Sequence, residues 1–273
     1  MFPSMVTDIM DNQFVVYANN KIIYIKMKHI DIFSSVSEYE TAKSGGTLIT
    51  PNISFINESG GVIYLPELDD PYNGHEYVEI GGLKWATMNI GASQPSDYGL
   101  YFAWGETQGY TAEQVGSGEG QRYFNAIDYK YGNGTSSPGA AGMTKYNATD
   151  GLTILEAVDD AAVVNWGGSW RMPTTDEFQA LGDAVNTTRT KVNNVDGILC
   201  TDKTNSSKTL FFPAGGFCGS SVASVGSEGN YWASSLHTTN KERAHQFLFN
   251  RYKVFWGHNI NRFFGFNIRP VAN

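Results

Sequence analysis

Gly229-Asn230-Tyr231-Trp232-Ala233-Ser234-Ser235 begins the block of sequence that decides the fold, and Gly265-Phe266-Asn267-Ile268-Arg269-Pro270-Val271 ends it. Two alternating apolar series lie between these ends: Phe247 and Phe249 in the first, Val254 and Trp256 in the second. Alternation with a period of two indicates strands with one buried face. We therefore expect these side chains to face a core and Phe255 to point the other way.

Residues 257–264 break this alternation, and we expect them to form a loop. Loops are usually polar, yet this one contains Ile260, Phe263 and Phe264. Aromatic side chains supply rigid contact area at recognition surfaces. Our first interpretation is therefore an exposed binding surface, and ordinary core packing or a subunit contact is the alternative.

The block carries an ordered set of anchor residues: Tyr231, Trp232, Ser234, Ser235, Ala244, Phe247, Phe249, Val254, Trp256, Gly265, Phe266, Arg269, Pro270 and Val271. In these anchors the chain resembles the C-terminal repeat of the Fibrobacter succinogenes major paralogous domain family. It resembles more closely the variable proteins of diversity-generating retroelements. Residues 98–106, Tyr-Gly-Leu-Tyr-Phe-Ala-Trp-Gly-Glu, resemble the same domain family.

The resemblance implies an α+β, C-type lectin-like fold with two helices and twisted antiparallel strands. It also implies a non-enzymatic protein that binds a ligand through a hypervariable surface formed by residues 230–271. The changeable positions between the anchors are the expected ligand-binding residues: Leu236, His237, Leu248, Asn250, Phe255, Gly257, His258, Asn259, Ile260, Asn261, Phe263 and Phe264. Randomising the adenines of an asparagine codon can produce each of these residue types, but not the Trp256 and Lys253 of the fixed skeleton.

Host recognition by a phage tail fibre is the most specific function that this resemblance suggests. The partner would be a protein or glycan receptor on a bacterial cell surface, and the protein would be located on a virion tail fibre or at an extracellular surface. A bacterial cell-surface adhesin of the same fold is the alternative. Residues 1–5 show no secretory signal pattern, and we expect no cofactor.

Charge and hydropathy exclude other partners. The chain of 273 residues has a formal net charge of −8, which argues against nucleic acid as a partner. After Asn230, however, Glu242 is the only acid among several cations: Lys241, Arg243, Arg251, Lys253, Arg262 and Arg269. This asymmetry predicts either a basic ligand face or ordinary solvated strand positions. No apolar run approaches the roughly 20 residues of a membrane span, so we expect no membrane insertion.

We expect two domains, a small and mostly β module at residues 1–70 and a ligand-binding domain at residues 71–273. In the module, short β-type runs occupy residues 14–17, 22–25, 53–56 and 62–65, and residues 37–43 could form a short helix. So small a module buries little surface alone. We therefore expect it to serve attachment or oligomerisation, for example as a homotrimer.

The larger domain should contain two helices and further strands. A first helix is expected within residues 154–164, and a second begins at the capping box formed by Thr174 and Glu177. Phe178, Leu181 and Val185 recur at helical spacing as the buried stripe of this second helix. Strands are expected on both sides of the Gly81-Gly82 turn and at residues 197–200 and 210–213. Residues 107–143 lack periodicity and predict a long surface loop.

Cysteine chemistry is not supported by the sequence. Formylglycine-generating enzymes, which have a related fold, use a pair of reactive cysteines near the C-terminus, but no cysteine follows Gly219 here. We expect Cys200 and Cys218 to be free, buried thiols, with a single disulfide as the alternative. An enzyme of that kind is therefore the least favoured interpretation.

Metal and histidine chemistry also lack the required residues. Calcium needs several converging carboxylates, which the C-terminal block does not supply, although a structural site near Asp159 and Asp160 stays open. No two histidines have a metal-ligand spacing. His237 and His258 could be neighbours across the variable face, where we expect them to contact a ligand.

Overall fold

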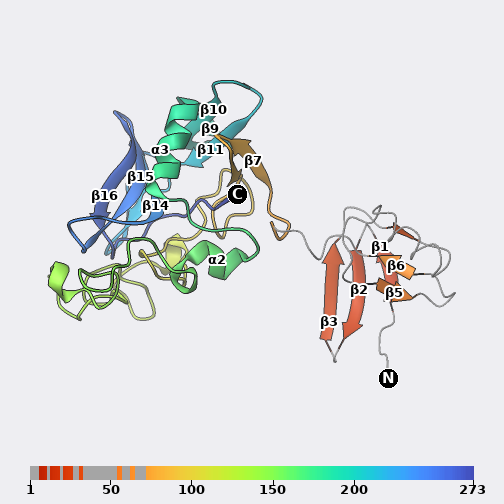
Figure 1. Ribbon diagram of the computed structural model, residues 1–273, viewed down its shortest axis with the longest axis horizontal. Helices are drawn as coiled ribbons and strands as arrows, with labels where there is room; N and C mark the ends of the chain where they lie inside the picture. The colour runs from red at the N-terminus through yellow and green to blue at the C-terminus, as the bar shows by residue number, and fades with distance from the viewer. Residues whose placement is uncertain are drawn as a thin grey trace. The chain divides into compact units, whose positions relative to one another are not determined.

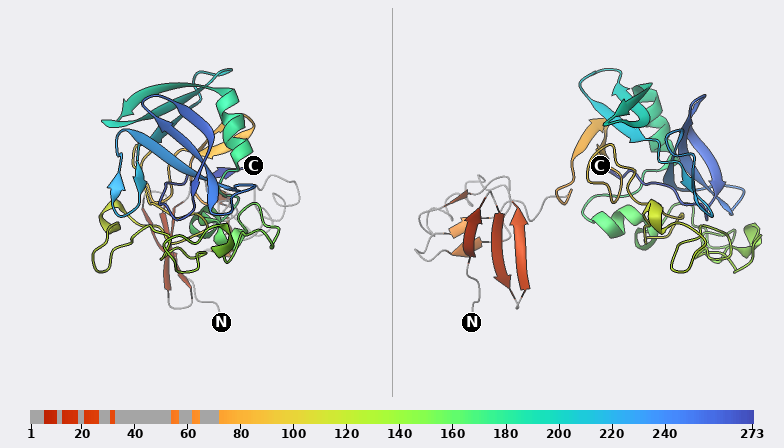
Figure 2. Two further views of the ribbon diagram at one scale, coloured as in Figure 1. Left: turned by 90° about the vertical axis from the view of Figure 1, so that its left-hand side faces the viewer. Right: turned by 180° about the vertical axis from the view of Figure 1, so that it is seen from behind.

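In the computed structural model the chain divides into two compact units, Met1–Asn73 and Gly74–Asn273 (Figures 1 and 2). The structure describes residues 72–273 and, before them, only the strands of the first unit by their backbone. The described elements are mostly antiparallel sheets with few helices, which is the coarse α+β composition expected.

The strands of the first unit form two small sheets. One has the order β1-β2-β3 and the other β4-β6-β5. Their bounds are β1 Val6–Met10, β2 Gln13–Ala18, β3 Lys21–Lys26, β4 Asp31–Ile32, β5 Ser54–Ile56 and β6 Val62–Tyr64. The four predicted β-type runs are confirmed as β2, β3, β5 and β6, whereas β1 and β4 were not predicted. The predicted helix at residues 37–43 lies outside the described residues.

The second unit is closed by pairing between its first and last strands. β7 (Tyr77–Ile80) and β8 (Leu83–Ala86) form the predicted hairpin, and β17 (Val271–Ala272) pairs with β8. The turn residues Gly81 and Gly82 have φ values of 63° and 81°, a region that favours glycine. The C-terminal strand therefore pairs with the hairpin that begins the unit. This pairing connects the C-terminal block, residues 229–271, to the first strands of the unit.

Two three-stranded antiparallel sheets make up most of the remaining β-structure. The first has the order β11-β10-β9 and the second β14-β15-β16, and a short hairpin, β12-β13, is separate from both. Their bounds are β9 Val185–Val192, β10 Val195–Asp202, β11 Thr209–Pro213, β12 Phe217–Cys218, β13 Val222–Ala223, β14 Glu228–Leu236, β15 Arg243–Asn250 and β16 Val254–Asn261. The predicted strands at residues 197–200 and 210–213 lie within β10 and β11, whereas β9 was not predicted.

Both predicted helices exist, with different bounds. α3 (Thr175–Ala184) begins with the predicted capping box between Thr174 and Glu177, and Phe178 and Leu181 are buried. Val185 is buried but is the first residue of β9, not the end of the helix. α2 (Ala161–Trp166) is shorter than predicted and is preceded by a turn of 3-10 helix, Ala157–Asp159. The carboxylate of Asp160 caps α2 by accepting from two backbone amides, which explains its start.

The core of the second unit consists of two apolar clusters. One joins α3 to the sheet β14-β15-β16, where the ring of Phe178 stacks on that of Phe247 with centroids 5.3 Å apart; Figure 1 shows α3 beside these strands. The other contains Trp104, Trp232 and Phe266. Cys200 lies in the first cluster and Cys218 in the second, and both are free, buried thiols as predicted. Burial raises the pKa of Cys200 to about 12 and also raises that of Cys218, so neither thiol is reactive.

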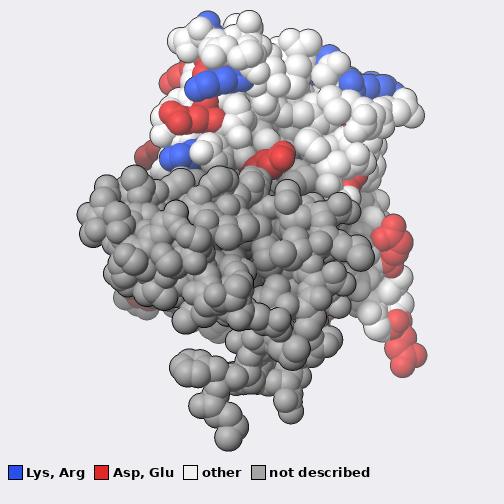
Figure 3. Space-filling view, turned by 90° about the vertical axis from the view of Figure 1, so that its right-hand side faces the viewer, with Lys and Arg blue, Asp and Glu red and all other residues white. Residues whose placement is uncertain are grey.

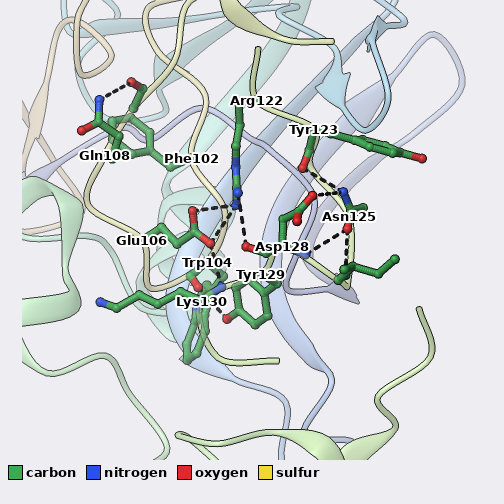
Figure 4. Close-up of polar contacts among 12 residues, drawn as sticks. Phe102, Trp104, Glu106, Gln108, Arg122, Tyr123, Asn125, Asp128, Tyr129 and Lys130 are labelled. Carbon is green, nitrogen blue, oxygen red and sulfur yellow. Dashed lines mark hydrogen bonds and ion pairs between the residues drawn. The ribbon is translucent and has the colours of Figure 1, made fainter. Parts of the chain in front are cut away.

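Residues 107–143 are irregular as predicted, but they are not simply a surface loop. Their only helical turns are of the 3-10 type, at Ala112–Gln114 and Ala140–Gly142. Five of their side chains are nevertheless buried in the core: Val115, Phe124, Tyr129, Tyr131 and Met143. Arg122 anchors the segment through a two-pronged contact with the carboxylate of Glu106, at 2.9 and 2.8 Å (Figure 4). The segment is therefore part of the packed unit, which its Gly- and Ser-rich composition concealed.

Candidate ligand-binding site

The expected loop at residues 257–264 is mostly strand, and the broken alternation marks a β-bulge. β16 runs to Asn261, but its register with β15 shifts between the pairs Leu248↔Phe255 and Gln246↔His258. One β15 residue between these pairs therefore faces two on β16. Phe255 and His258 consequently share one face of the sheet although their spacing is odd.

The opposite face of β16 packs on α3. Trp256 packs against the cluster that contains Phe178 and lies so close to Gly182 that a Cβ there would be 2.6 Å from the indole. The predicted inward orientation of Val254 and Trp256 is confirmed, although both are only partly buried. Gly257 also faces the helix, because an added Cβ would lie 3.0 Å from the side-chain amide of Gln179. The structure therefore places Gly257, predicted to contact a ligand, on the α3 side of the sheet.

A concave pocket of about 220 Å³ lies on the outer face of the sheet, and we name it the Gln246 pocket. Its apolar lining residues are Phe217, Leu248, Ile260, Phe264 and Phe266, and its polar ones are Glu228, Asn230, Gln246 and His258. Four predicted ligand-binding residues are thus brought together: Leu248, His258, Ile260 and Phe264. The register pairs Phe255 with Leu248, and its ring lies 5.7 Å from that of His258, which places Phe255 beside the pocket.

The polar floor of this pocket is a buried amide. Gln246 is 2% exposed, and its Nε2 lies 3.1 Å from Nδ1 of His258. Its Oε1 has no hydrogen-bond partner among the described residues. Burial and the nearby charge of Arg243 lower the pKa of His258, so the imidazole is neutral at neutral pH and its Nδ1 accepts from the amide.

Sequence reasoning missed several pocket residues, notably Gln246, Asn230 and Glu228. A signal for Gln246 was present, because it lies on the outward side of the alternation that buries Phe247 and Phe249. Asn230 donates its side-chain amide to the carbonyl of Gly216 at 3.0 Å, a contact across the fold that no local pattern reveals.

Leu236 and His237 are among the predicted site residues that do not line this pocket. Leu236, predicted to face a ligand, is 3% exposed and belongs to a core cluster. His237 stacks on His245 with ring centroids 5.4 Å apart, and its Nδ1 accepts from the backbone amide of Asn240. The structure therefore pairs His237 with His245, whereas His258 contacts Gln246.

The asparagines among the predicted site residues have structural contacts. Oδ1 of Asn250 accepts from the amides of Tyr252 and Lys253 and shapes the turn between β15 and β16. Oδ1 of Asn259 accepts from Arg243 at 3.1 Å, on the sheet face opposite His258. The carbonyl of Asn261 accepts from the amide of Phe264 at the end of the strand. Their side chains are half-buried.

Phe263 and Phe264 line a second pocket of about 300 Å³, which they share with the irregular segment. That segment contributes Tyr123 and Ile127, which are 41% and 54% exposed. Because Phe264 also lines the Gln246 pocket, the two pockets are neighbours. The contribution of residues 123–127 was not predicted, since their sequence shows no periodicity.

The expected basic face is smaller than the sequence indicates. Arg262 and Arg269 are fully buried, so neither contributes to a surface. Arg269 donates to Asn89 and to the carbonyls of Ala86, Thr87 and Phe211, and burial lowers its pKa to about 10. Figure 3 views the molecule from the side away from β14, β15 and β16, and on the part of the second unit visible there acidic and basic side chains are interspersed.

Asp159 and Asp160, considered as a structural calcium site, have protein partners instead. Asp159 accepts from Lys130, Lys145, Tyr131 and Tyr146, and these hydrogen bonds hold its pKa well below the usual range against the effect of burial. Asp160 accepts from the amides of Ala162, Val163 and Met172. These donors use the oxygens that a cation would need. The described residues contain no cluster of three or more potential metal ligands.

Comparisons with known proteins give no relative. No family model matches the chain, and neither a curated protein nor a solved structure matches it. Among the helices within residues 72–273, none combines the length and apolar character needed to cross a bilayer.

Proposed function

We propose that residues 74–273 form a C-type lectin-like domain that binds a receptor without catalysing a reaction. Recognition takes place on the outer face of the sheet β14-β15-β16, around the Gln246 pocket. The domain belongs, in this proposal, to the variable proteins of diversity-generating retroelements. The support for this assignment comes from residues 98–106 and 230–271, the two stretches that resemble these families.

One observation carries the proposal: most anchor residues are buried, with Ser235, Val254 and Trp256 partly buried, whereas most positions between them are not fully buried. Tyr231, Trp232, Phe247, Phe249 and Arg269 are each 0% exposed. Between them lie half-buried positions that border a concavity, including Leu248, Phe255, His258 and Ile260. A diversified protein needs this separation, because its changeable side chains must not carry the free energy of folding.

The two stretches that resemble the domain family also bind each other. Nε1 of Trp104 donates to the carbonyl of Ala233, and Nε1 of Trp232 donates to the carbonyl of Phe102, both at 2.8 Å. Arg262, in the C-terminal block, lies 5.3 Å from the Trp104 ring. Reciprocal contacts of this kind support a single folding unit in which residues 98–106 fix the strands that display the pocket.

We further propose that the protein is the receptor-binding part of a phage tail fibre. The partner is then a protein or glycan on the surface of a bacterial host, and the first unit serves attachment or assembly with copies of itself. The second unit supports this role through its two apolar concavities with partly exposed aromatic residues, which suit recognition better than chemistry.

The DNA beside the gene tests the family assignment. We expect a reverse-transcriptase gene and a near-repeat of the C-terminal coding segment, with adenines at the codons for Leu248, Phe255, His258 and Ile260. Tail-assembly genes in the same neighbourhood would support the phage role, and a cell-surface secretion locus would instead identify an adhesin. A coding segment without any such repeat, identical in independent isolates, would contradict diversification.

A further inference from the structure

We propose that the Gln246 pocket binds one neutral aromatic side chain that carries a hydrogen-bond donor, a tyrosine or tryptophan presented by a protein partner. The donor bonds to Oε1 of Gln246, and the ring lies against the apolar walls. This inference rests on the proposed recognition function and selects a protein receptor over a glycan.

The size of the pocket limits its occupant to a single side chain. Its volume of about 220 Å³ is below the roughly 300–1,000 Å³ of pockets that hold whole small molecules. A pocket of this size matches the anchor positions of protein interfaces, where one aromatic residue fills a desolvated hollow. A chain of sugar rings could place only part of itself here.

The walls of the pocket favour a ring. Phe217, Phe264 and Phe266 line it together with Leu248 and Ile260. The rings of Phe217 and Phe264 meet edge to face, with centroids 6.1 Å apart and planes at 89°. Aromatic rings bind favourably in either arrangement and bury a large apolar area.

The floor of the pocket requires a donor. Oε1 of Gln246 is buried and unpartnered among the residues described, while Nε2 is used by His258. A buried acceptor without a partner is unfavourable, and a ligand that supplies a donor removes this penalty. Glu228 adds a second acceptor to the lining, while the amide nitrogen of Asn230 is already bonded to Gly216.

The same groups argue against other ligand chemistries. An alkyl side chain would leave Oε1 of Gln246 unpaired, and a carboxylate or phosphate would meet the negative charge of Glu228. An ammonium group would be attracted by Glu228, but it would lose its hydration among three phenylalanines and a neutral amide. A neutral ring with one donor packs against the apolar lining residues and supplies the hydrogen bond that Oε1 of Gln246 lacks.

Titrations of the full chain with side-chain mimics test this inference. The probes are p-cresol for tyrosine, toluene as its counterpart without a donor, and n-butylammonium for lysine. We expect p-cresol to bind in the millimolar range and at least about 10-fold more tightly than toluene, because only p-cresol satisfies Gln246. The side-chain amide signals of Gln246 should shift with p-cresol in NMR spectra.

Substitutions separate this site from others. Gln246→Met keeps a similar volume but removes the acceptor, so it should abolish the preference for p-cresol over toluene. Ile127→Ser is the matched control, because Ile127 lines the second pocket and is 54% exposed. It should leave p-cresol binding unchanged. NMR spectra of both variants report whether each is folded.

Several results would overturn the inference. These are equal affinity for toluene and p-cresol, tighter binding of n-butylammonium, no binding of p-cresol, or an unchanged preference in Gln246→Met. The affinity of Gln246→Met for the receptor tests whether the pocket takes part in recognition. This affinity should fall at least about 10-fold. If p-cresol binds as expected but receptor binding survives in Gln246→Met, the pocket is not the receptor anchor, while recognition by another part of the face still stands.

Discussion

The indole of Trp256 stacks on the ring of Phe247, with centroids 4.5 Å apart and planes inclined by 14°. This contact joins β16 to β15 on the face that packs against α3. On the other face of the same strands, Gln246 and His258 form the floor and wall of a pocket. The α3 side of the sheet is therefore core, whereas the other side is shared: Trp232 and Ala244 belong to the second core cluster there, beside the pocket.

Trp256→Ala should lower the free energy of unfolding by about 3 kcal/mol, at the lower end of values for buried aromatic residues because Trp256 is only partly buried. Tyr252→Ala, in the adjoining turn, is the control, because Tyr252 is 76% exposed. Denaturant unfolding measures both variants. Equal stability of the two would show that the faces of β16 have been assigned incorrectly.

Gly182→Ala should destabilise the protein even though alanine is favoured in helices by about 1 kcal/mol. The reason is the 2.6 Å approach between an added Cβ and the Trp256 indole. In the Trp256→Ala background the same change should become neutral or stabilising. A double-mutant cycle measures this coupling, and additive effects would rule out the contact between α3 and β16.

Asp159→Asn should lower the free energy of unfolding by about 2 kcal/mol at neutral pH, since it weakens the contacts with Lys130 and Lys145. The pKa of Asp159 is depressed in the folded state, so its contribution is present above the unfolded-state value of about 4 and is lost as the pH falls through the folded-state pKa. The difference between wild type and variant should therefore shrink below about pH 4. A difference that stays constant in acid would contradict this role.

Binding of p-cresol should weaken about 10-fold as the pH falls below the usual histidine pKa of about 6.5 and His258 gains a proton. Its pKa is lowered by burial and by Arg243, so protonation occurs below the usual value of about 6.5. A protonated Nδ1 donates, so Gln246 must turn its oxygen toward His258 and away from the ligand. In His258→Asn the pH dependence of p-cresol binding should vanish. If it persists, a group other than His258 is responsible for it.

Chelation should change neither the melting temperature nor receptor binding. The oxygens of Asp159 and Asp160 accept from protein donors, and the face around the pocket includes Glu228 as its one acidic lining residue. Thermal unfolding and binding are measured with and without EDTA. A loss of either that calcium restores would show that a metal site supports this face.

Local patterns in the sequence were sufficient for much of the framework. The capping box at Thr174 located α3, and period-two alternation oriented Phe247 and Phe249 toward the core. β9 was missed because its sequence, Val-Asn-Thr-Thr-Arg-Thr-Lys-Val, has an exposed face and no apolar alternation. Asn193 and Asn194, both with positive φ, form the turn that could have revealed its hairpin.

The site was harder to predict because it depends on contacts between distant residues. A bulge in β16 reverses the expected orientation after Trp256, which moves Gly257 onto α3 and His258 onto the pocket face. Arg262 looks like a surface cation in the sequence, yet it is buried beneath the carbonyls of Lys145 and Tyr146. Neither arrangement has a local signature, since each depends on a partner elsewhere in the fold.

We propose that the part of the outer face of β14-β15-β16 around Leu248 and Phe255 recognises a receptor and contributes little to folding. Leu248 and Phe255 test it best, because they pair across the strands on that face and pack against neither core cluster. Phe247→Ser, one residue away and fully buried, is the matched control and should unfold the protein.

The decisive measurement compares unfolding free energy with binding of the labelled full chain to bacterial cells, for wild type and the Leu248→Ser/Phe255→Ser variant. The wild type should label the cells of at least one species in a panel. The double variant should keep its stability within about 1 kcal/mol and lose at least about 30-fold in binding, or roughly 2 kcal/mol. A variant that unfolds, or one that stays folded and binds as tightly as wild type, would contradict the claim.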